Sequence, residues 1–474
     1  MTKKSCYITT AIPYVNAKPH IGHALEYVIA DATHRYYELA GRNVRIISGA
    51  DENALKNVQA AQKAGIPIQK FLDQNSQVFK DFYKLLEVDL DEFRRGSDKK
   101  LHHPGVEKIW KLVEKNGDLY KKKYKGLYCV GCEEFKTEKE LVSGKCPDHD
   151  KKPEVIEEEN YFFKLSKYQD KLLHLIESDE YKILPEKRKN EVVSFIKSGL
   201  EDFSVSRSEE RAKGVGIPVP GDPTQKIYVW FDALTIYMTG SGWGYDEALW
   251  KKWWPCDLHV IGKDIIRFHA VYWPAMLLSA GLSLPKSLLV HGFITSDGRK
   301  MSKTIGNVVD PYEIIDKYGV EALRYYLLAK IPTLDDGDFT KENFEQVYQA
   351  DLANGIGNLV SRVAKLCQIS GLRVNVSIHR YSKSVAKHLN DFQFDKALKL
   401  IWNNTKDADK TINEKEVWTL KDKEQEVILV DLVERIRQIA TDLKPFLPET
   451  AEKIEKQFGQ EIKSGKPLFP RLDR

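Results

Sequence analysis

The chain has 474 residues, of which 42% are hydrophobic and 30% are charged, and its formal net charge is only +4. This composition is typical of a soluble globular protein of two to four domains, since one domain usually holds roughly 100–200 residues. The small net charge excludes a globally basic surface and leaves only local patches for nucleic-acid binding, and no apolar run of about 18 residues supports a membrane span.

The cysteines and the N-terminal residues indicate in which cellular compartment the protein is expected. The first eleven residues lack the long apolar core of a signal peptide. Three of the six cysteines lie between Cys129 and Cys146, a poor disulfide framework for a long chain and a better metal cluster. We therefore expect a cytosolic or another reducing compartment.

The first predicted elements are a buried strand at residues 7–12 and a helix at residues 21–39. His20 and His23 lie three residues apart at the start of this helix, with Gly22 between them. A helix start favours a phosphate through its N–H groups and partial positive charge, and Gly22 lets a ligand approach the backbone. The alternative is that both histidines only form hydrogen bonds with the local backbone.

A second strand, at residues 43–51, completes a strand–helix–strand unit and so predicts a parallel sheet. Ligands bind at the carboxyl ends of such strands, so we expect His20, His23 and Asp51 at one edge of the sheet. Asp51 either holds a ligand ammonium there or caps a helix predicted at residues 53–64.

Two close pairs of metal-binding residue types follow, Cys129 with Cys132 and Cys146 with His149. Pairs with a spacing of two residues, joined by a loop, are typical of a tetrahedral zinc knuckle. All four ligand positions are filled, so the pattern predicts a structural rather than a catalytic zinc ion. Four unrelated side chains are the alternative.

Strand and helix patterns alternate again from residue 226. The block of residues 119–225 is therefore interpreted as an insertion that divides one α/β domain. The further elements expected are strands at residues 226–233, 258–264 and 287–294, and helices at residues 163–183, 191–198 and 265–280, with a charged loop at residues 185–189.

A cationic stretch at residues 297–307 contains Lys300, Met301, Ser302 and Lys303. Its composition and flanking glycines predict a mobile loop. Two lysines three residues apart, with a hydroxyl between them, suit a polyphosphate, and an ordinary basic surface loop is the alternative.

Beyond residue 350 the sequence is almost wholly helical, which predicts a separate all-α domain. Trp418 lies between two of its helices in a polar neighbourhood, where it either packs in a core or stacks on a base. The helices expected from residue 310 onward cover residues 310–330, 350–369, 382–389, 394–408, 423–443 and 449–458.

The motifs at residues 20–23 (His-Ile-Gly-His) and 300–303 (Lys-Met-Ser-Lys) together form the paired signature of class I aminoacyl-tRNA synthetases. Along its whole length the chain resembles the methionyl-tRNA synthetase family, with a knuckle of the single-knuckle bacterial type. The stretches that carry this resemblance further are residues 11–16, 228–233, 259–264, 268–269, 273–274, 357–362 and 467–473, together with Trp418.

The resemblance implies a Rossmann-like parallel-sheet catalytic domain that is split by the knuckle insertion and followed by an α-helical anticodon-binding bundle. The implied divisions are residues 1–118 for the first catalytic half, 119–225 for the insertion, 226–349 for the second half with the lysine motif and a stem-contact region, and 350–474 for the bundle.

The implied activity joins L-methionine to ATP as methionyl-adenylate and transfers methionine to tRNA(Met), including the initiator tRNA. The implied cofactors are ATP with Mg²⁺ and one structural Zn²⁺. The tRNA would contribute its acceptor end and its CAU anticodon. We expect no membrane association, a cytoplasmic location and a monomer, since the dimerisation module of some relatives is absent after Arg474.

The resemblance also implies roles for particular residues. Asp51 would pair with the methionine ammonium, and the Ile12 N–H and the Tyr237 hydroxyl would face the sulfur. The implied catalytic residues are His20, His23, Lys300 and Lys303; ATP would also contact Gly22, Gly262, Asp264, Met301 and Ser302; methionine would contact Ala11, Ile12, Tyr14, Asp51, Trp230, Leu234, Tyr237 and His269; the anticodon would contact Asn358, Arg362 and Trp418; and zinc would bind Cys129, Cys132, Cys146 and His149.

Four alternatives have different sequence requirements. Nucleotidyltransferases share the His-x-Gly-His motif but are usually smaller and need neither a knuckle nor a helical domain. Synthetases for leucine, isoleucine or valine carry a much larger insertion than residues 119–225, and a cysteine enzyme would place metal-binding cysteines near the first histidines. A non-catalytic tRNA-binding paralogue would not need His20, His23 or Lys303, which are all present.

Overall fold

The structure is a computed structural model that describes residues 4–147, 150–301, 307–377 and 379–472. The chain divides into two compact units. The first unit comprises Met1–Pro19 and Arg42–Val290, and the second comprises His20–Gly41 and His291–Arg474. Among the described helices, none is both long and apolar enough to cross a membrane.

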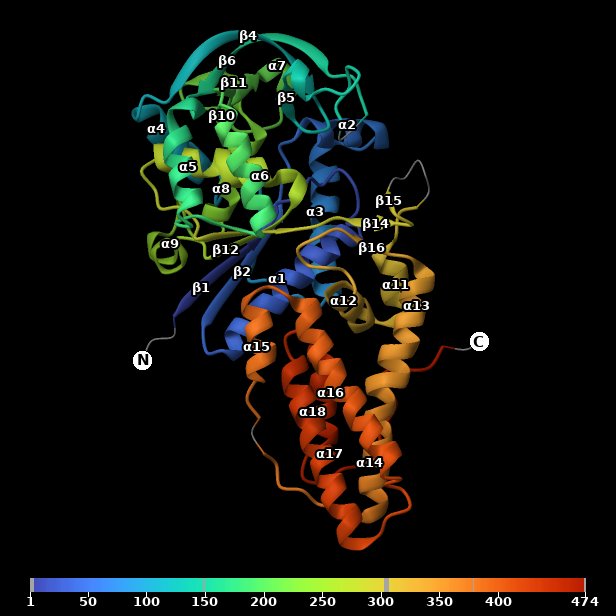
Figure 1. Ribbon diagram of the computed structural model, residues 1–474. Coiled ribbons are helices and arrows are strands. Elements are labelled where there is room, and N and C mark those ends of the chain that lie inside the picture. The colour runs from blue at the N-terminus through green and yellow to red at the C-terminus, as the bar shows by residue number, and fades with distance from the viewer. Residues whose placement is uncertain (1–3, 148–149, 302–306, 378, 473–474) are drawn as a thin grey trace. The chain divides into compact units, whose positions relative to one another are not determined.

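A six-stranded sheet organises the first unit, in the order β3-β2-β1-β12-β13-β7. Its strands β1, β2 and β12 are labelled in Figure 1. Strand β1 pairs in parallel with both β2 and β12, and every residue of β1 after Ser5 is buried. Such continuous burial is typical of a parallel sheet covered on both faces, which confirms the predicted α/β fold. The strands are β1 (Ser5–Thr10), β2 (Asn43–Ala50), β3 (Glu92–Arg95), β7 (Lys182–Leu184), β12 (Leu258–Gly262) and β13 (Ser287–His291).

One helix of the first unit begins inside a stretch that the sequence predicts as a strand. The strand predicted at residues 226–233 ends at Ile227, and helix α8 begins at Val229. Every residue of α8 is buried, so it lacks a polar face and its apolar run resembles that of a buried strand. The helices are α2 (Leu55–Ala64), α3 (Ile68–Leu85), α4 (His103–Lys115), α5 (Gln169–Glu177), α6 (Glu186–Lys197), α7 (Glu209–Ala212), α8 (Val229–Thr239), α9 (Glu247–Trp253) and α10 (Trp273–Ser279), which follows the 3₁₀ turn η3 (Lys263–Ile265) and the π-helical turn η4 (Phe268–Tyr272).

The predicted insertion contains more strand than expected. Strands β4 and β6 form a long antiparallel ladder, in which Lys123 faces Glu159 and Lys125 faces Glu157. The helix predicted at residues 163–183 is wrong at both ends, which lie in β6 and β7, and the loop predicted at residues 185–189 opens α6. The remaining elements here are β4 (Leu119–Cys129), β5 (Glu134–Lys136), η1 (Glu138–Glu140), β6 (Glu154–Phe163), η2 (Leu165–Tyr168), β8 (Phe203–Ser204), β9 (Ser206–Ser208), β10 (Pro218–Val219) and β11 (Asp222–Ile227).

The second unit includes helix α1 (Ile21–Leu39), although this helix follows β1 in the chain. A fully buried ion pair joins α1 to α12, since Arg324 Nη2 lies 2.6 Å from an Asp31 carboxylate oxygen. Burial by itself would raise the pKa of Asp31, but Arg324 and Arg35 hold it below its ordinary value. The carboxylate is therefore charged, and the pair holds α1 on the second unit.

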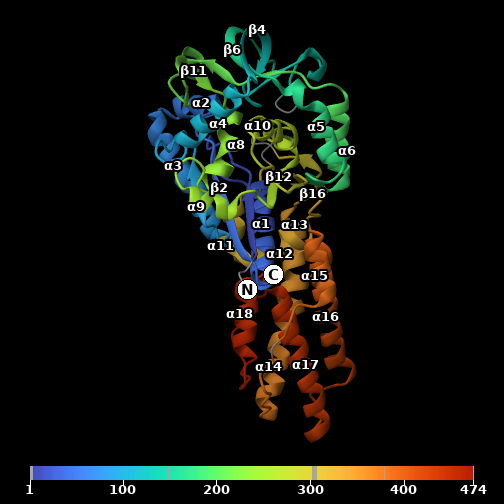
Figure 2. The same ribbon diagram turned by 90° about the vertical axis from the view of Figure 1, so that its left-hand side faces the viewer.

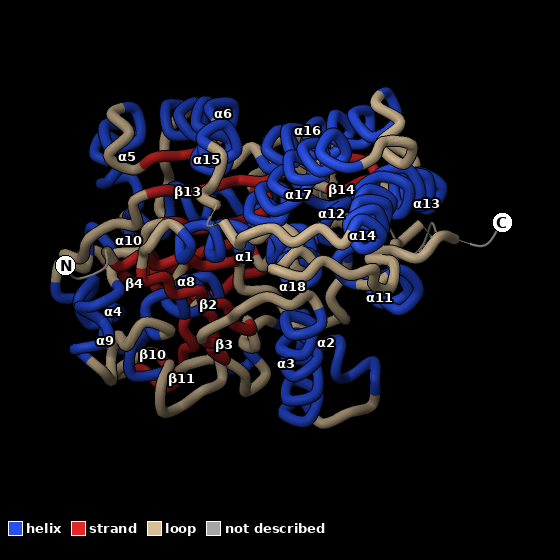
Figure 3. The backbone as a smooth tube through the Cα atoms, turned by 90° about the horizontal axis from the view of Figure 1, so that it is seen from below, coloured by secondary structure: helices blue, strands red, loops and turns tan. Residues whose placement is uncertain are grey.

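Helices α14, α16, α17 and α18 lie side by side as a bundle (Figures 1 and 2), which confirms the helical character expected after residue 350. In Figure 3, the view from below, several of these helices are seen end-on. The elements of the second unit after α1 are β14 (Ile294–Ser296), β15 (Arg299–Lys300), α11 (Pro311–Tyr318), α12 (Val320–Ala329), β16 (Gly337–Asp338), α13 (Lys341–Val347), the π-helical η5 (Tyr348–Gly357), α14 (Asn358–Ser370), α15 (Lys383–Asn390), α16 (Phe394–Glu414), α17 (Asp422–Leu443) and α18 (Pro448–Gln457).

Candidate active site

Several expected methionine-binding residues come directly after two neighbouring strands of the first unit. Strands β1 and β2 pair in parallel, so their carboxyl ends meet at one edge of the sheet. Beyond these ends, Tyr14 and Asp51 form an isolated bridge, and the Asp51 N–H donates to the Pro13 carbonyl oxygen over 2.9 Å. The expected residues that follow the two strands are Ala11, Ile12, Tyr14 and Asp51.

The Asp51 side chain is buried in an acidic neighbourhood. Burial raises its pKa well above the ordinary range, and the charges of Asp232 and Glu133 raise it further, while Lys56 opposes the shift. The N-cap position of α2 is Ala54, which excludes the alternative that Asp51 caps this helix. A buried carboxylate with carboxylate neighbours favours a bound cation, such as an ammonium group.

Trp230, in α8, lies at the centre of an aromatic cluster. Its ring stacks on Phe268 with a centroid distance of 3.8 Å, and it meets Tyr14 nearly at right angles with a centroid distance of 6.1 Å. Among the described residues, neither the buried Tyr14 hydroxyl nor the buried Trp230 Nε1 has a hydrogen-bond partner. Buried polar atoms are normally paired, so these two atoms point to a ligand that would pair with them.

Tyr237 and His269 form a hydrogen bond of defined direction. His269 Nδ1 lies 3.0 Å from the Ile265 carbonyl oxygen and must donate to it, so Nε2 accepts from the Tyr237 hydroxyl over 2.8 Å. Burial lowers the pKa of His269 to about 4, which keeps the ring neutral at pH 7. The Tyr237 hydroxyl would therefore have to turn before it could donate to a thioether. Leu234, one turn earlier in α8, is also buried.

His20 and His23 form a capping box at the start of α1 in the second unit. His20 Nδ1 accepts from the Gly22 N–H, and His23 Nδ1 accepts from the His20 N–H, each over 3.1 Å. The alternative of bonding to the local backbone is thus observed. It is compatible with phosphate binding, because an accepting Nδ1 places the proton of each neutral ring on Nε2, as a donor. Burial, followed by the charges of His20 and His291, lowers the pKa of His23.

Gly22 provides space for the His20 ring. A Cβ atom at Gly22 would lie only 2.9 Å from the Cε1 atom of that ring. Any larger residue would therefore disturb the capping box, which is a local reason for glycine besides the expected approach of a ligand.

The other expected ATP-binding residues lie in different parts of the chain. Gly262 ends β12, next to β1 in the sheet, and the exposed Asp264 follows in the short turn η3. Lys300 lies in β15, paired with Thr295 of β14, and Met301 follows it. Ser302 and Lys303 lie outside the described residues. The expectation that His20, His23 and Asp51 share one edge of the sheet stays a prediction.

Three of the four expected zinc ligands are brought together. The sulfur atoms of Cys129, Cys132 and Cys146 all lie within 4.8 Å of one another. The Cys132 and Cys146 sulfurs are 3.5 Å apart, which is too far for a disulfide of about 2.05 Å. Ligands about 2.3 Å from a tetrahedral zinc ion lie roughly 3.8 Å apart, so the thiols fit three corners of such a site. His149 lies outside the described residues.

The expected anticodon residues lie in the second unit. Asn358 begins α14, and Arg362 lies one turn later, where its guanidinium donates over 2.8 Å to both Asp409 and Asn413 of α16. This guanidinium also lies 5.9 Å from the centre of the Trp418 ring. The Trp418 side chain is 52% exposed, which favours base stacking over core packing. Sequence spacing could not reveal Asp409 and Asn413, since they lie on another helix.

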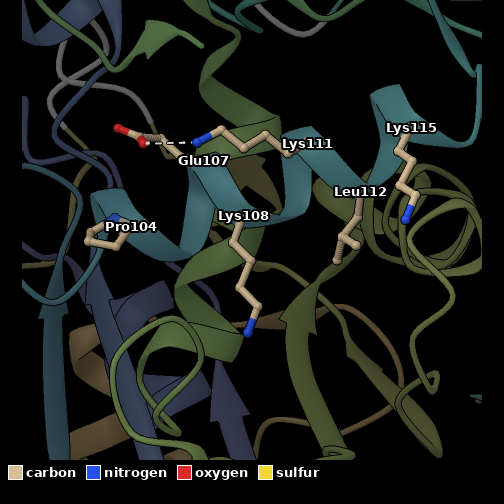
Figure 4. A pocket seen from close by; sticks show the side chains of 6 residues that line it. All are labelled: Pro104, Glu107, Lys108, Lys111, Leu112 and Lys115. Atoms are coloured by element: carbon tan, nitrogen blue, oxygen red, sulfur yellow. Dashed lines mark ion pairs between the residues drawn. The ribbon is translucent and has the colours of Figure 1, made fainter.

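The surface pocket on α4, about 370 Å³ in volume, holds none of the expected site residues. Its lining comes from one helix alone (Figure 4), so it is a groove between exposed side chains. The residues around it are Pro104, Glu107, Lys108, Lys111, Leu112 and Lys115.

Comparison with known proteins places these features in one family. A family model described as tRNA synthetases class I (M) matches residues 6–151 and 148–364. A methionine–tRNA ligase of Clostridium acetobutylicum is 41% identical in an alignment that covers 99% of this chain and 79% of the relative. One from Nostoc sp. is 40% identical, and the alignment covers 96% of this chain and 90% of the relative.

Solved structures agree with this result. A Mycobacterium tuberculosis methionyl-tRNA synthetase in complex with methionyl-adenylate is 36% identical, with a TM-score of 0.91 over 99% of this chain and 100% of that chain. The apo form of the Mycobacterium tuberculosis enzyme gives a TM-score of 0.84 at 33% identity, over 100% of this chain and 99% of that chain.

Proposed function

This chain belongs to the methionyl-tRNA synthetase family of class I, and from that premise we propose which of its residues bind each substrate. The enzyme activates L-methionine with ATP to methionyl-adenylate and transfers the methionyl group to tRNA. The observation that carries the assignment of the methionine pocket is the buried Asp51 carboxylate, whose backbone is bridged to Tyr14, the residue whose ring meets that of Trp230.

Asp51 pairs with the α-ammonium of methionine in this proposal, because a cation relieves the electrostatic cost of its burial. The thioether needs an apolar wall with few polar groups, since sulfur is only a weak acceptor. The Ile12 N–H faces the sulfur. The Tyr237 hydroxyl also faces it once its hydrogen bond to His269 is broken. The methionine pocket comprises Ala11, Ile12, Tyr14, Asp51, Trp230, Leu234, Tyr237 and His269.

ATP binding requires donors to the phosphates and contacts to the adenosine. In the activation step the methionine carboxylate attacks the α-phosphorus and pyrophosphate leaves, so the protein mainly stabilises developing negative charge. His20 and His23 donate through Nε2, the tautomer that their capping box favours. Lys300 and Lys303 neutralise the β- and γ-phosphates, and Mg²⁺ carried by ATP would supply further positive charge there. The further ATP contacts proposed are Gly22, Gly262, Asp264, Met301 and Ser302.

We assign recognition of the tRNA anticodon to the start of α14 and to Trp418. Asn358, Arg362 and Trp418 read the CAU anticodon, including that of the initiator tRNA, because an exposed tryptophan beside a fixed guanidinium can stack on and hydrogen-bond to unstacked bases. The domain divisions at residues 118/119, 225/226 and 349/350 are part of this proposal. A monomeric state and a cytoplasmic location stay predictions.

The amino-acid specificity is tested by ATP–pyrophosphate exchange measured separately with each of the twenty amino acids. Only methionine should give strong exchange with the purified full chain. Exchange with another amino acid, or none with methionine, would overturn the proposed pocket.

Replacing Cys132 with serine is expected to release the zinc ion that we assign to Cys129, Cys132, Cys146 and His149. A thiolate ligand is lost, and a closed structural site depends on all four ligands. Zinc content measured by atomic absorption should fall from about one ion per chain to near zero. The control is Cys367→Ser, because Cys367 is a buried thiol in the second unit outside the cluster. Retention of zinc by the Cys132 variant would contradict the assignment.

A further inference from the structure

Lys56, in the first turn of α2, connects the turn that carries Cys129 and Cys132 to a wall of the proposed methionine pocket. Its ammonium nitrogen donates to the Gly131 carbonyl oxygen over 2.9 Å. The same nitrogen lies 3.3 Å from the centre of the Tyr14 ring. One cation is thus held between a backbone carbonyl and an aromatic face, where each contact is strengthened because water is largely excluded.

Glu133 fixes the end of this connection that is next to the cysteines. It is fully buried, and its backbone has a positive φ of 56°, in the left-handed region that non-glycine residues rarely adopt. One carboxylate oxygen accepts from the Lys56 backbone N–H over 3.0 Å, and the other accepts from Arg207 over 3.1 Å. The Glu133 carbonyl oxygen accepts from the Tyr228 hydroxyl over 2.5 Å. With so many partners, residues 131–133 form a rigid base for Lys56.

Tyr14 is the other end of the connection, and its side chain packs against the buried core of the first unit. Its backbone is fixed by the bridge to Asp51, but its buried hydroxyl has no hydrogen-bond partner among the described residues. The ring meets Trp230 only through a perpendicular contact. The ammonium of Lys56 is therefore the polar group that holds the plane of the Tyr14 ring.

We propose that Lys56 is a positioning residue for methionine binding, which holds the Tyr14 ring in place by anchoring it to the Gly131–Glu133 turn. This inference rests on the proposed pocket, because Lys56 acts through Tyr14 and does not contact the substrate. Its effect should fall on methionine and leave ATP binding and the chemical step largely unchanged.

The test compares Lys56→Met and Lys56→Gln with Lys56→Arg in the full chain. The first two remove the positive charge, and glutamine keeps a donor for the Gly131 carbonyl oxygen, while arginine keeps a cation for the Tyr14 ring. Loss of a desolvated cation–π contact should raise the methionine KM in ATP–pyrophosphate exchange, and the calorimetric Kd for methionine, roughly tenfold. The KM for ATP and kcat should stay within about twofold, and Lys56→Arg should recover most of the affinity.

Two further variants make the result specific. Lys63→Met, an exposed lysine of the same helix, should behave as the unchanged protein. In a Tyr14→Leu background, Lys56→Met should add nothing, because effects that pass through one contact are not additive. Any of three results would overturn the proposal. The methionine Kd could be unchanged in both Lys56→Met and Lys56→Gln, or the KM for ATP could rise as much as the KM for methionine. The third is a full tenfold effect of Lys56→Met in the Tyr14→Leu background.

Tyr14→Leu alone separates this inference from the pocket assignment. If that variant binds methionine normally, the placing of Tyr14 in the pocket fails, and the role of Lys56 fails with it. If it loses affinity while the uncharged Lys56 variants do not, only the inference about Lys56 fails.

Discussion

Replacing Asp51 with asparagine is expected to raise the KM for methionine by roughly 10²–10³-fold, since removing one partner of a buried ion pair costs about 3–5 kcal/mol. The amide has nearly the same shape but cannot neutralise the ammonium of the substrate. ATP–pyrophosphate exchange over a range of methionine concentrations measures the effect. The matched control is Asp89→Asn, which alters an exposed carboxylate of the same unit.

Asp51 also gives the reaction a characteristic pH dependence. Burial and the nearby carboxylates raise its pKa, so in the free enzyme it becomes protonated at a higher pH than an ordinary aspartate, whose pKa is about 3.9. Only the ionised form pairs with the ammonium, so kcat/KM for methionine should fall as the pH decreases through the raised pKa. The Asp51→Asn variant should lose this acidic limb. If methionine kinetics of that variant match those of the unchanged protein, Asp51 is not in the site.

Replacing Trp418 with alanine is expected to lower kcat/KM for tRNA by roughly 10²-fold, because stacking contributes about 1–3 kcal/mol per base and Arg362 loses an aromatic neighbour. Aminoacylation of tRNA(Met) measures this loss. ATP–pyrophosphate exchange needs no tRNA and should be unchanged, because half of the Trp418 side chain is exposed to solvent.

Two variants control for this result. Trp418→Phe retains a stacking face and should recover much of the aminoacylation rate, whereas Val427→Ala alters another exposed apolar side chain of the second unit and should have no effect. Equal losses in exchange and aminoacylation would indicate a folding defect and would remove Trp418 from the anticodon site.

Prediction from the sequence succeeded where one periodicity dominates and failed where two structures share a pattern. The bundle helices α16 and α17 were predicted because their apolar residues recur at helical spacing around polar positions. The strand predicted at residues 226–233 wrongly includes the first residues of helix α8, since a helix buried on every side carries no such period. The helix predicted at residues 163–183 is wrong at its ends, because these lie in β6 and β7, which pair with β4 and β13.

The sequence by itself determined the features that depend on short covalent spacing. The pairing of Cys129 with Cys132, the capping box of His20 and His23, and the separation of Asn358 from Arg362 by one helical turn all follow from neighbouring positions in the chain. Only the tertiary structure decided which distant groups meet. It placed Lys56 between Gly131 and Tyr14, made the Tyr237 hydroxyl a donor to His269, and buried Asp51 among carboxylates. Contacts between distant segments, and the burial that shifts a pKa, arise only when the whole chain packs, so no local pattern encodes them.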